Sequence, residues 1–255
     1  FRALEPMQPP RLPREVAGGV REALAGGKPM CGGCGAKVGG AALGRVLAGL
    51  PEGGRPDVET RPGDDAAVLK IGRTRQVVTT DHLRAFTEDP WMLSRIAAIH
   101  AMGDVWAMGA APQAALATVV LPRMTEEMAE NWLSEIMAAA SEVFAAEGAE
   151  IVGGHSSTGS ELTVGFTVTG LARAAPVTLA GGQPGDALIL TKPVGSGTVL
   201  AGEMALAARG EWVAAALESM ARPQGDAAAA LSAAHAMTDV TGFGLAGHLM
   251  GMCDA

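Results

Sequence analysis

The sequence predicts an α/β fold in two domains. Between residues 66 and 171, short runs rich in β-branched residues alternate with two long segments of helical periodicity. A stretch rich in glycine and proline at 174–186 marks a domain boundary, and strand-like and helical patterns resume after it. The chain has 255 residues, of which 48% are apolar and only 4% aromatic, so it can bury a substantial core built from aliphatic side chains and methionine.

The first part of the chain predicts a linker, a helix and a hairpin. Residues 1–29 carry several prolines among scattered charges, so we interpret them as a linker with at most one weak helix at 14–24. The segment 40–50 has helical spacing. Runs at 66–71 and 76–80 predict two strands joined by a glycine-containing turn, with acidic residues entering the first strand and leaving the second.

Two long helices are expected next. Asp89 followed by Pro90 is typical of a helix start, and the helix to about residue 108 is apolar nearly all round, which predicts burial. The composition of residues 114–121 predicts a buried strand. Thr125 is the expected cap of an amphipathic helix that ends near Glu147, and we assign the acids along it to a solvated face.

Shorter elements complete the pattern. We expect a strand at 150–152, a polar glycine loop at 153–157 and an alternating strand at 162–171. After the boundary, 187–191 predicts another strand, followed by a glycine loop at 192–197 and alanine-rich helices. The final helical pattern is unfinished and the first residue is Phe, so we expect the chain to be part of a longer protein. The predicted domains are therefore a linker (1–29), an N-terminal domain (30–173) and an incomplete C-terminal domain (174–255).

Composition excludes several classes of function. A formal net charge of -8 without a basic patch argues against a nucleic-acid partner. A chain of this size with three cysteines does not fit the pattern of a secreted, disulfide-linked protein, so we expect it to reside in a reducing cytoplasm. The longest uncharged run, 105–122, is interrupted by glycine and proline, and no membrane span is predicted.

The most reactive stretch is the glycine-rich loop that carries Cys31, Cys34 and Lys37. Its glycines allow close approach to a ligand, and the lysine supplies a point charge suited to phosphate. A C-x-x-C pair is often half of a zinc site, but the only other cysteine is Cys253 and no second ligand pair is present. The pattern therefore favours a thiol that handles redox chemistry, selenium or sulfur.

Four separate segments each place aspartate at an element end or in an apolar setting: Asp64 with Asp65, Asp81, Asp104 and Asp239. Carboxylate oxygens are the ligands that Mg²⁺ takes, with phosphate and water completing its shell. Asp104 follows His100 by one helical turn. Two alternatives stay open: Asp104 is an ordinary exposed acid at a helix end, and Asp239 is the cap of the following helix. Because neighbouring strand residues face opposite ways, Asp64 and Asp65 should not both reach one ion.

Taken together, these segments resemble a known family. The resemblance rests on CGGCGAK (31–37), GDDAAV (63–68), TTD (79–81), RIAA with GDVWAMG (95–109), VGGHS (152–156), LTKPVGSG (190–197) and AMTDVTGFGLAGHL (236–249). The chain is similar over about residues 30–255 to the selenophosphate synthetases, or selenide, water dikinases, of the aminoimidazole ribonucleotide synthetase-like superfamily. The resemblance implies a two-domain fold whose N-terminal mixed sheet and helices build a β-barrel in a homodimer. It also implies Mg²⁺-dependent conversion of ATP, selenide and water to selenophosphate, AMP and phosphate.

The resemblance also implies roles for individual residues. Cys34 takes the position of the essential cysteine or selenocysteine, and Lys37 that of a catalytic, phosphate-contacting lysine. Asp65, Asp104 and Asp239 take the metal-ligand positions. The nucleotide-contacting positions fall on Lys37, Asp64, Asp81, Asp104, Gly153, Gly154 and His155. The chain departs from the family pattern at Ala36, at Pro62-Gly63 and at Gly103.

Two other functions stay open on the sequence alone. The chain is alternatively a non-catalytic selenium or sulfur carrier, or a small-molecule kinase of the same superfamily. The expected partners are ATP and selenide, a second copy that shares the active sites, and a selenium-delivery protein. The cysteine-containing loop and the upstream proline-rich linker further resemble members that are fused behind a pyridine-nucleotide oxidoreductase.

Overall fold

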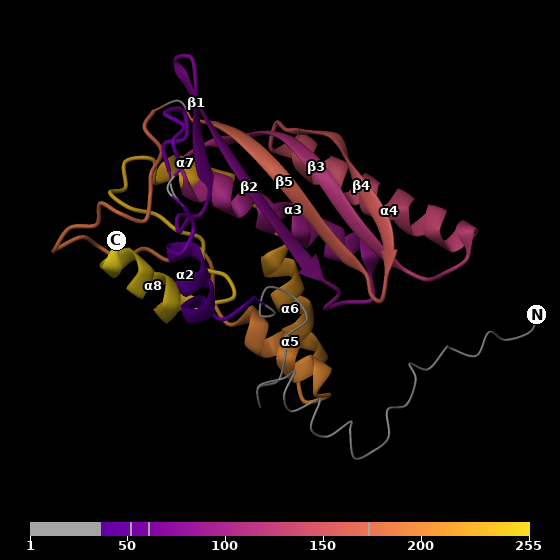
Figure 1. Ribbon diagram of the computed structural model, residues 1–255. Helices are drawn as coiled ribbons and strands as arrows, with labels where there is room; N and C mark the ends of the chain where they lie inside the picture. Colours follow the sequence, from indigo (N-terminus) through magenta and orange to yellow (C-terminus); the bar gives the residue numbers. More distant parts are fainter. Residues whose placement is uncertain (1–36, 52, 61, 173) are drawn as a thin grey trace, which may run out of the picture. The chain divides into compact units, whose positions relative to one another are not determined.

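The computed structural model describes residues 37–51, 53–60, 62–172 and 174–255. Its elements, in chain order, are α2 (Gly40–Ala48), β1 (Ala67–Ile71), β2 (Thr74–Arg84), α3 (Pro90–Ala107), β3 (Ala111–Pro122), α4 (Glu126–Ala146), β4 (Glu150–Gly159), β5 (Thr163–Ala172), α5 (Ser196–Met204), α6 (Gly210–Met220), α7 (Gly225–Ala230) and α8 (Gly244–Asp254). Figure 1 labels these elements. The helix predicted at 14–24 lies outside the described residues.

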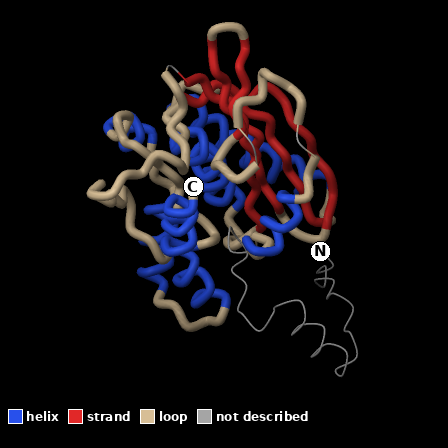
Figure 2. The backbone as a smooth tube through the Cα atoms, turned by 60° about the vertical axis from the view of Figure 1, so that its left-hand side comes forward, coloured by secondary structure: helices blue, strands red, loops and turns tan. Residues whose placement is uncertain are grey.

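The five strands form one mixed sheet in the order β1-β2-β5-β3-β4. All neighbouring pairs are antiparallel except β3 and β4, which are parallel and are therefore joined by a crossover helix, α4. The helices α3 and α4 pack against one face of this sheet (Figures 1 and 2). Among the described residues the sheet does not close on itself, and the barrel expected in a dimer stays a prediction.

Local sequence explains where the two long helices begin. The side chain of Asp89 accepts a hydrogen bond from the Met92 N–H, and Pro90 occupies the first turn of α3. Thr125 caps α4 in the same way by accepting from the Met128 N–H. Both predicted helix starts are confirmed.

The core lies between the sheet and these two helices. Helix α3 is buried on nearly all sides, as its apolar pattern predicted. The rings of Phe144 on α4 and Phe166 on β5 pack edge to face with 5.1 Å between their centroids. Within the described residues, no helix is long and apolar enough to cross a membrane.

Two strand predictions were wrong in extent. Strand β2 continues past residue 80 because the long β5 pairs with it to Arg84, so Asp81 lies within the strand instead of after it. Residues 153–157 are not a loop, because they continue the parallel ladder of β4 with β3. Glycine is needed there: a Cβ at Gly154 would collide with the backbone of Ala117.

The strand predicted at 187–191 does not form. In the part of the chain that the structure describes, no neighbouring strand pairs with this segment, so its backbone has no ladder to join. Leu188 and Ile189 are 75% and 65% exposed. Its largely apolar composition alone was therefore insufficient to define a strand.

Candidate metal and phosphate site

Three aspartates from distant segments meet beside α3. One carboxylate oxygen from each of Asp65, Asp104 and Asp239 lies within 4.8 Å of the others. Asp65 precedes β1, Asp104 lies in the last turns of α3, and Asp239 lies in the turn before α8. The structure therefore brings together the three residues that were predicted as metal ligands.

Neighbouring residues hold these carboxylates in place. The buried Thr79 hydroxyl on β2 donates a hydrogen bond to Asp104 Oδ2 at 2.5 Å, and the Thr238 hydroxyl donates to Asp65 Oδ1 at 3.1 Å. Gly103 allows Asp239 to approach α3, since a Cβ at this position would lie 3.2 Å from Asp239 Oδ2. The glycine that appeared unusual in the sequence thus has a spatial reason.

The cluster lacks a positive charge of its own. Burial, and then repulsion from Asp104, raises the pKa of Asp65 to about 7. Burial, and then repulsion from Asp239, raises the pKa of Asp104 to about 7. Burial, and then repulsion from Asp65, raises the pKa of Asp239 to about 6. Each value lies well above the ordinary 3.8 because three acids share one poorly solvated site.

One buried oxygen in the cluster has no partner. Among the residues that the structure describes, nothing donates a hydrogen bond to Asp65 Oδ2, which is shielded from solvent. A divalent cation would supply both the missing partner and the missing charge, and carboxylate oxygens are suitable ligands for it. The residues present therefore fit a divalent cation.

A second charged group adjoins the cluster. Asp81 Oδ2 lies 2.8 Å from His100 Nε2 and 3.4 Å from Lys37 Nζ. Burial opposes ionisation of Asp81, but the contact with His100 and the charges of His100 and Lys37 outweigh it and lower its pKa to about 2. Asp81 is thus an ionised anchor between the Lys37 ammonium and the His100 imidazole.

The pKa values of His100 and Lys37 both depend on the aspartates around them. Burial alone would lower the pKa of His100, but its contact with Asp81 raises that pKa above the ordinary value. Burial likewise opposes the charge on Lys37, while attraction to Asp81, Asp239 and Asp104 raises its pKa overall. His100 was not predicted as a site residue, although its position one turn before Asp104 was the signal that could have identified it.

Asp64 lies near the cluster but outside the group of three. Its Oδ1 accepts hydrogen bonds from the backbone N–H groups of Asp65 and Leu179. This arrangement agrees with the expectation that adjacent aspartates point in different directions. The predicted contact of Asp64 with a nucleotide stays a prediction, and Cys31 and Cys34 lie outside the described residues.

The predicted nucleotide contacts on β4 do not join the cluster within one chain. Across the sheet, Asp81 is paired with Phe166, and Phe166 with Ala117, so these three residues share the face that α3 and α4 cover. His155 is paired with Thr118, the residue after Ala117, and both are exposed on the opposite face. Three strand spacings, about 14 Å, also separate β2 from β4.

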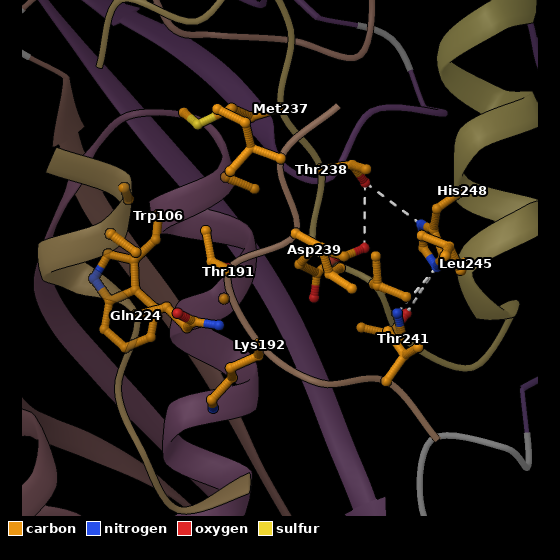
Figure 3. A pocket seen from close by; sticks show the side chains of 18 of the residues that line it. Trp106, Thr191, Lys192, Gln224, Met237, Thr238, Asp239, Thr241, Leu245 and His248 are labelled. Atoms are coloured by element: carbon orange, nitrogen blue, oxygen red, sulfur yellow. Dashed lines mark hydrogen bonds between the residues drawn. The ribbon is translucent and has the colours of Figure 1, made fainter. Parts of the chain in front are cut away.

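A cavity of about 500 Å³ opens next to the cluster (Figure 3). Its walls come from α3, residues 187–196, α6, α7 and the segment that includes Asp239 and α8. Lys192 lines it and donates a hydrogen bond to the Arg222 carbonyl at 2.5 Å. Burial, and then the charge of Arg222, lowers the pKa of Lys192 to about 8. The sequence had indicated only a glycine loop at this place.

Comparisons with known proteins agree with the architecture. Residues 63–172 match the family described as AIR synthase related protein, N-terminal domain, and residues 183–255 match the corresponding C-terminal domain. The selenide, water dikinase of Desulfitobacterium hafniense (strain Y51) is 44% identical over 226 residues, which are 85% of this chain and 65% of that protein. That of Nitrosomonas eutropha is 37% identical over 233 residues, 88% of this chain and 66% of that protein.

The chain thus spans about 65% of the length of the curated relatives that it matches. Among solved structures, AaThiL complexed with AMPPCP and TMP superposes with a TM-score of 0.60 at 19% identity, covering 78% of this chain and 63% of that one. At this identity the likeness shows the fold alone. Together the matches confirm the predicted fold class, while the domain boundary at residue 174 stays a prediction.

Proposed function

We propose that this chain makes selenophosphate. The premise is that it belongs to the AIR synthase related family and, within it, to the selenide, water dikinases. The proposed reaction converts ATP, selenide and water to selenophosphate, AMP and phosphate. The relatives' names support the reaction. The chain's own geometry supports the part of it that handles phosphate.

The observation that carries the proposal is the carboxylate cluster beside Lys37. Phosphoryl transfer depends mainly on positioning and on neutralising charge, which calls for cations on both sides of the phosphates. Asp65, Asp104 and Asp239 would hold Mg²⁺ on one side. On the other, Asp81 anchors the Lys37 ammonium at 3.4 Å.

In this proposal each residue has a separate task. Bound Mg²⁺ would neutralise phosphate charge and orient the polyphosphate for in-line displacement. Lys37 binds phosphate oxygens as a point charge, and Asp81, kept ionised by His100, fixes the position of that charge. Cys34, three residues before Lys37 in the sequence, is proposed to hold the selenium species next to the phosphate. A selenium-delivery protein in a reducing cytoplasm is the proposed source.

Product analysis tests this function. The protein is incubated anaerobically with ATP and Mg²⁺, with and without selenide, and nucleotides are separated by chromatography. The proposal predicts AMP that forms only when selenide is present. ADP as the product would indicate a small-molecule kinase instead, and the absence of nucleotide turnover would favour a carrier.

We further propose that the active site is completed by a second copy of the chain. His155 lies on the exposed face of the sheet, away from Asp81, and β4 is the last strand of the sheet in the described part of the chain. A twofold axis beside this strand would bring Gly153, Gly154 and His155 of one subunit to the cysteine loop of the other.

Complementation between two inactive variants tests the shared site. A Cys34→Ser protein is co-refolded with a His155→Ala protein, each inactive by itself. About half of the dimers are then mixed, and one of the two sites in each mixed dimer carries no lesion, so roughly a quarter of wild-type activity should return. A confirmed heterodimer that shows no recovery would mean that His155 serves its own chain.

A further inference from the structure

A half-buried histidine on α8, His248, has no part in the roles described above. Its ring faces the turn that carries Asp239 (Figure 3). Nδ1 lies 3.4 Å from the Thr238 hydroxyl oxygen, and Nε2 lies 3.3 Å from the Thr241 hydroxyl oxygen. The ring therefore bridges two hydroxyl groups that approach it from different sides.

The backbone decides which ring nitrogen carries the proton. The Thr241 backbone N–H points at His248 Nε2 at 3.1 Å, and a backbone N–H can only donate. Nε2 must therefore be the unprotonated acceptor, which leaves the proton of the neutral ring on Nδ1. Burial, and then the charge of Lys37, lowers the pKa of His248, which favours the neutral ring. Nδ1–H then donates to the Thr238 hydroxyl.

This donation directs the Thr238 hydroxyl toward the carboxylate cluster. Its own proton has two acceptors in reach, Asp65 Oδ1 at 3.1 Å and the Asp239 carbonyl oxygen at 3.3 Å. The Asp65 oxygen is closer, and it is also charged once Asp65 is ionised, so it is the stronger acceptor. Asp65 Oδ1 is thereby engaged, and the buried, unpartnered Oδ2 is the oxygen left for a cation.

The other end of the network reaches the phosphate side of the site. Lys37 Nζ donates to the Thr241 hydroxyl at 3.4 Å, and α2, which follows Lys37, lies beside α8 (Figure 1). The Lys37 ammonium is thus held by the Thr241 side chain, and the Thr241 backbone N–H donates to His248 Nε2. From the ring onward, His248 Nδ1–H and the Thr238 hydroxyl both point toward Asp65 Oδ1, and hydrogen bonds aligned in one direction strengthen one another.

We propose that His248 is a positioning residue: through Thr238 it orients Asp65 for cation binding, and through Thr241 it ties Lys37 to the same network. The inference rests on the proposed function only in that the carboxylate cluster holds a divalent cation. It assigns no proton transfer to His248.

Two substitutions distinguish the roles of the two ring nitrogens of His248. An Asn side chain places its amide near the position of Nδ1, so His248→Asn retains a donor for Thr238. A Gln side chain reaches the position of Nε2, so His248→Gln retains the acceptor for Thr241 and loses that donor. We expect Mn²⁺ affinity, measured by electron paramagnetic resonance titration, to fall about tenfold or more in the Gln variant. The Asn variant should stay within about threefold of wild type, and Thr238→Val should match the Gln variant.

Equal Mn²⁺ affinity in the Asn and Gln variants, whether reduced or not, would overturn the inference. Thermal unfolding in EDTA checks that both variants are folded, which is expected because His248 is half-buried and lies outside the core cluster. If a variant fails to fold, the tautomer in the wild-type protein still provides a test. The sequence contains five histidines, so long-range ¹H–¹⁵N spectra can resolve each ring. His248 should be the Nδ1–H form, and an Nε2–H ring would refute the network.

These measurements distinguish failure of the inference from failure of the proposed function. The tautomer is read in the metal-free protein, and Mn²⁺ binding requires neither ATP nor selenide. A protein that binds Mn²⁺ as predicted but forms no AMP would contradict only the proposed reaction. The Nδ1–H ring together with equal Mn²⁺ affinities in the Asn and Gln variants would contradict only the positioning role.

Discussion

Replacing Asp104 by Asn should stabilise the metal-free protein and abolish its stabilisation by Mg²⁺. In the folded protein the pKa of Asp104 is about 7, roughly three units above the ordinary 3.8. Each unit corresponds to about 1.4 kcal/mol, so keeping this group ionised at about pH 8 costs about 4 kcal/mol. Part of that cost is repulsion shared with Asp239, and we therefore expect a gain of about 2–4 kcal/mol in the free energy of unfolding.

The pH dependence follows from the direction of the pKa shift. Because the pKa is higher in the folded than in the unfolded state, the folded protein binds this proton more tightly. The wild-type protein in EDTA should then lose stability as the pH rises from about 4 to about 7. The Asn variant should lose less stability over this range. The free energies of unfolding of the two proteins should therefore differ strongly at about pH 8 and little at about pH 4. An Asn side chain can still accept the hydrogen bond from Thr79.

Urea denaturation followed by circular dichroism measures these effects, in EDTA and in millimolar Mg²⁺. Wild type should gain stability on adding Mg²⁺, and the Asp104→Asn variant should not. Asp64→Asn is the matched control, because Asp64 lies outside the group of three and an amide oxygen can still accept its two backbone hydrogen bonds. Destabilisation of the Asp104 variant in EDTA, combined with an unchanged response to Mg²⁺, would refute the reasoning.

Three further outcomes are expected. Cys34→Ser should abolish selenide-dependent ATP consumption while Cys31→Ser retains most of it; equal losses would instead indicate a joint role for the two thiols. Gly103→Ala should weaken Mn²⁺ binding by crowding Asp239 while leaving thermal stability equal or higher, since alanine favours a helix by up to about 1 kcal/mol; unchanged Mn²⁺ affinity would contradict this. Asp81→Asn in EDTA should lower the free energy of unfolding at neutral pH by about 2 kcal/mol, because the folded-state pKa of about 2 stabilises the protein above about pH 4. That loss should vanish as the pH falls to about 2, and a loss independent of pH would argue against an ionised anchor.

The elements with strong local signals could be predicted from the sequence. Capping residues identified the starts of α3 and α4, and an all-round apolar pattern in α3 and an amphipathic one in α4 predicted how each is buried, because these signals act within a few residues. Four scattered segments with aspartates predicted a cation site, and three of the acids do meet. The segment 187–191 shows the limit of such reasoning, since a strand requires a partner that composition does not supply.

The hydrogen bonds that organise the site could not be predicted. Thr238 meets Asp65 across 173 positions of sequence, and no spacing rule connects them. Likewise, the contact of His100 with Asp81 depends on how α3 crosses β2, which is a property of tertiary packing. The exposed position of His155 followed only from the observed register of β4 against β3. Motifs thus predicted candidate site residues, and the fold determined how the described ones are held.

The most direct test of the account is to observe the phosphorus–selenium bond. The protein is supplied with ATP, Mg²⁺ and selenide enriched in selenium-77, and the reaction is followed by phosphorus NMR. We predict a new phosphorus resonance split by coupling to selenium, growing in step with AMP and inorganic phosphate, and absent in the Asp104→Asn variant. ATP that is consumed to ADP, or to AMP without a selenium-coupled resonance, would contradict the account.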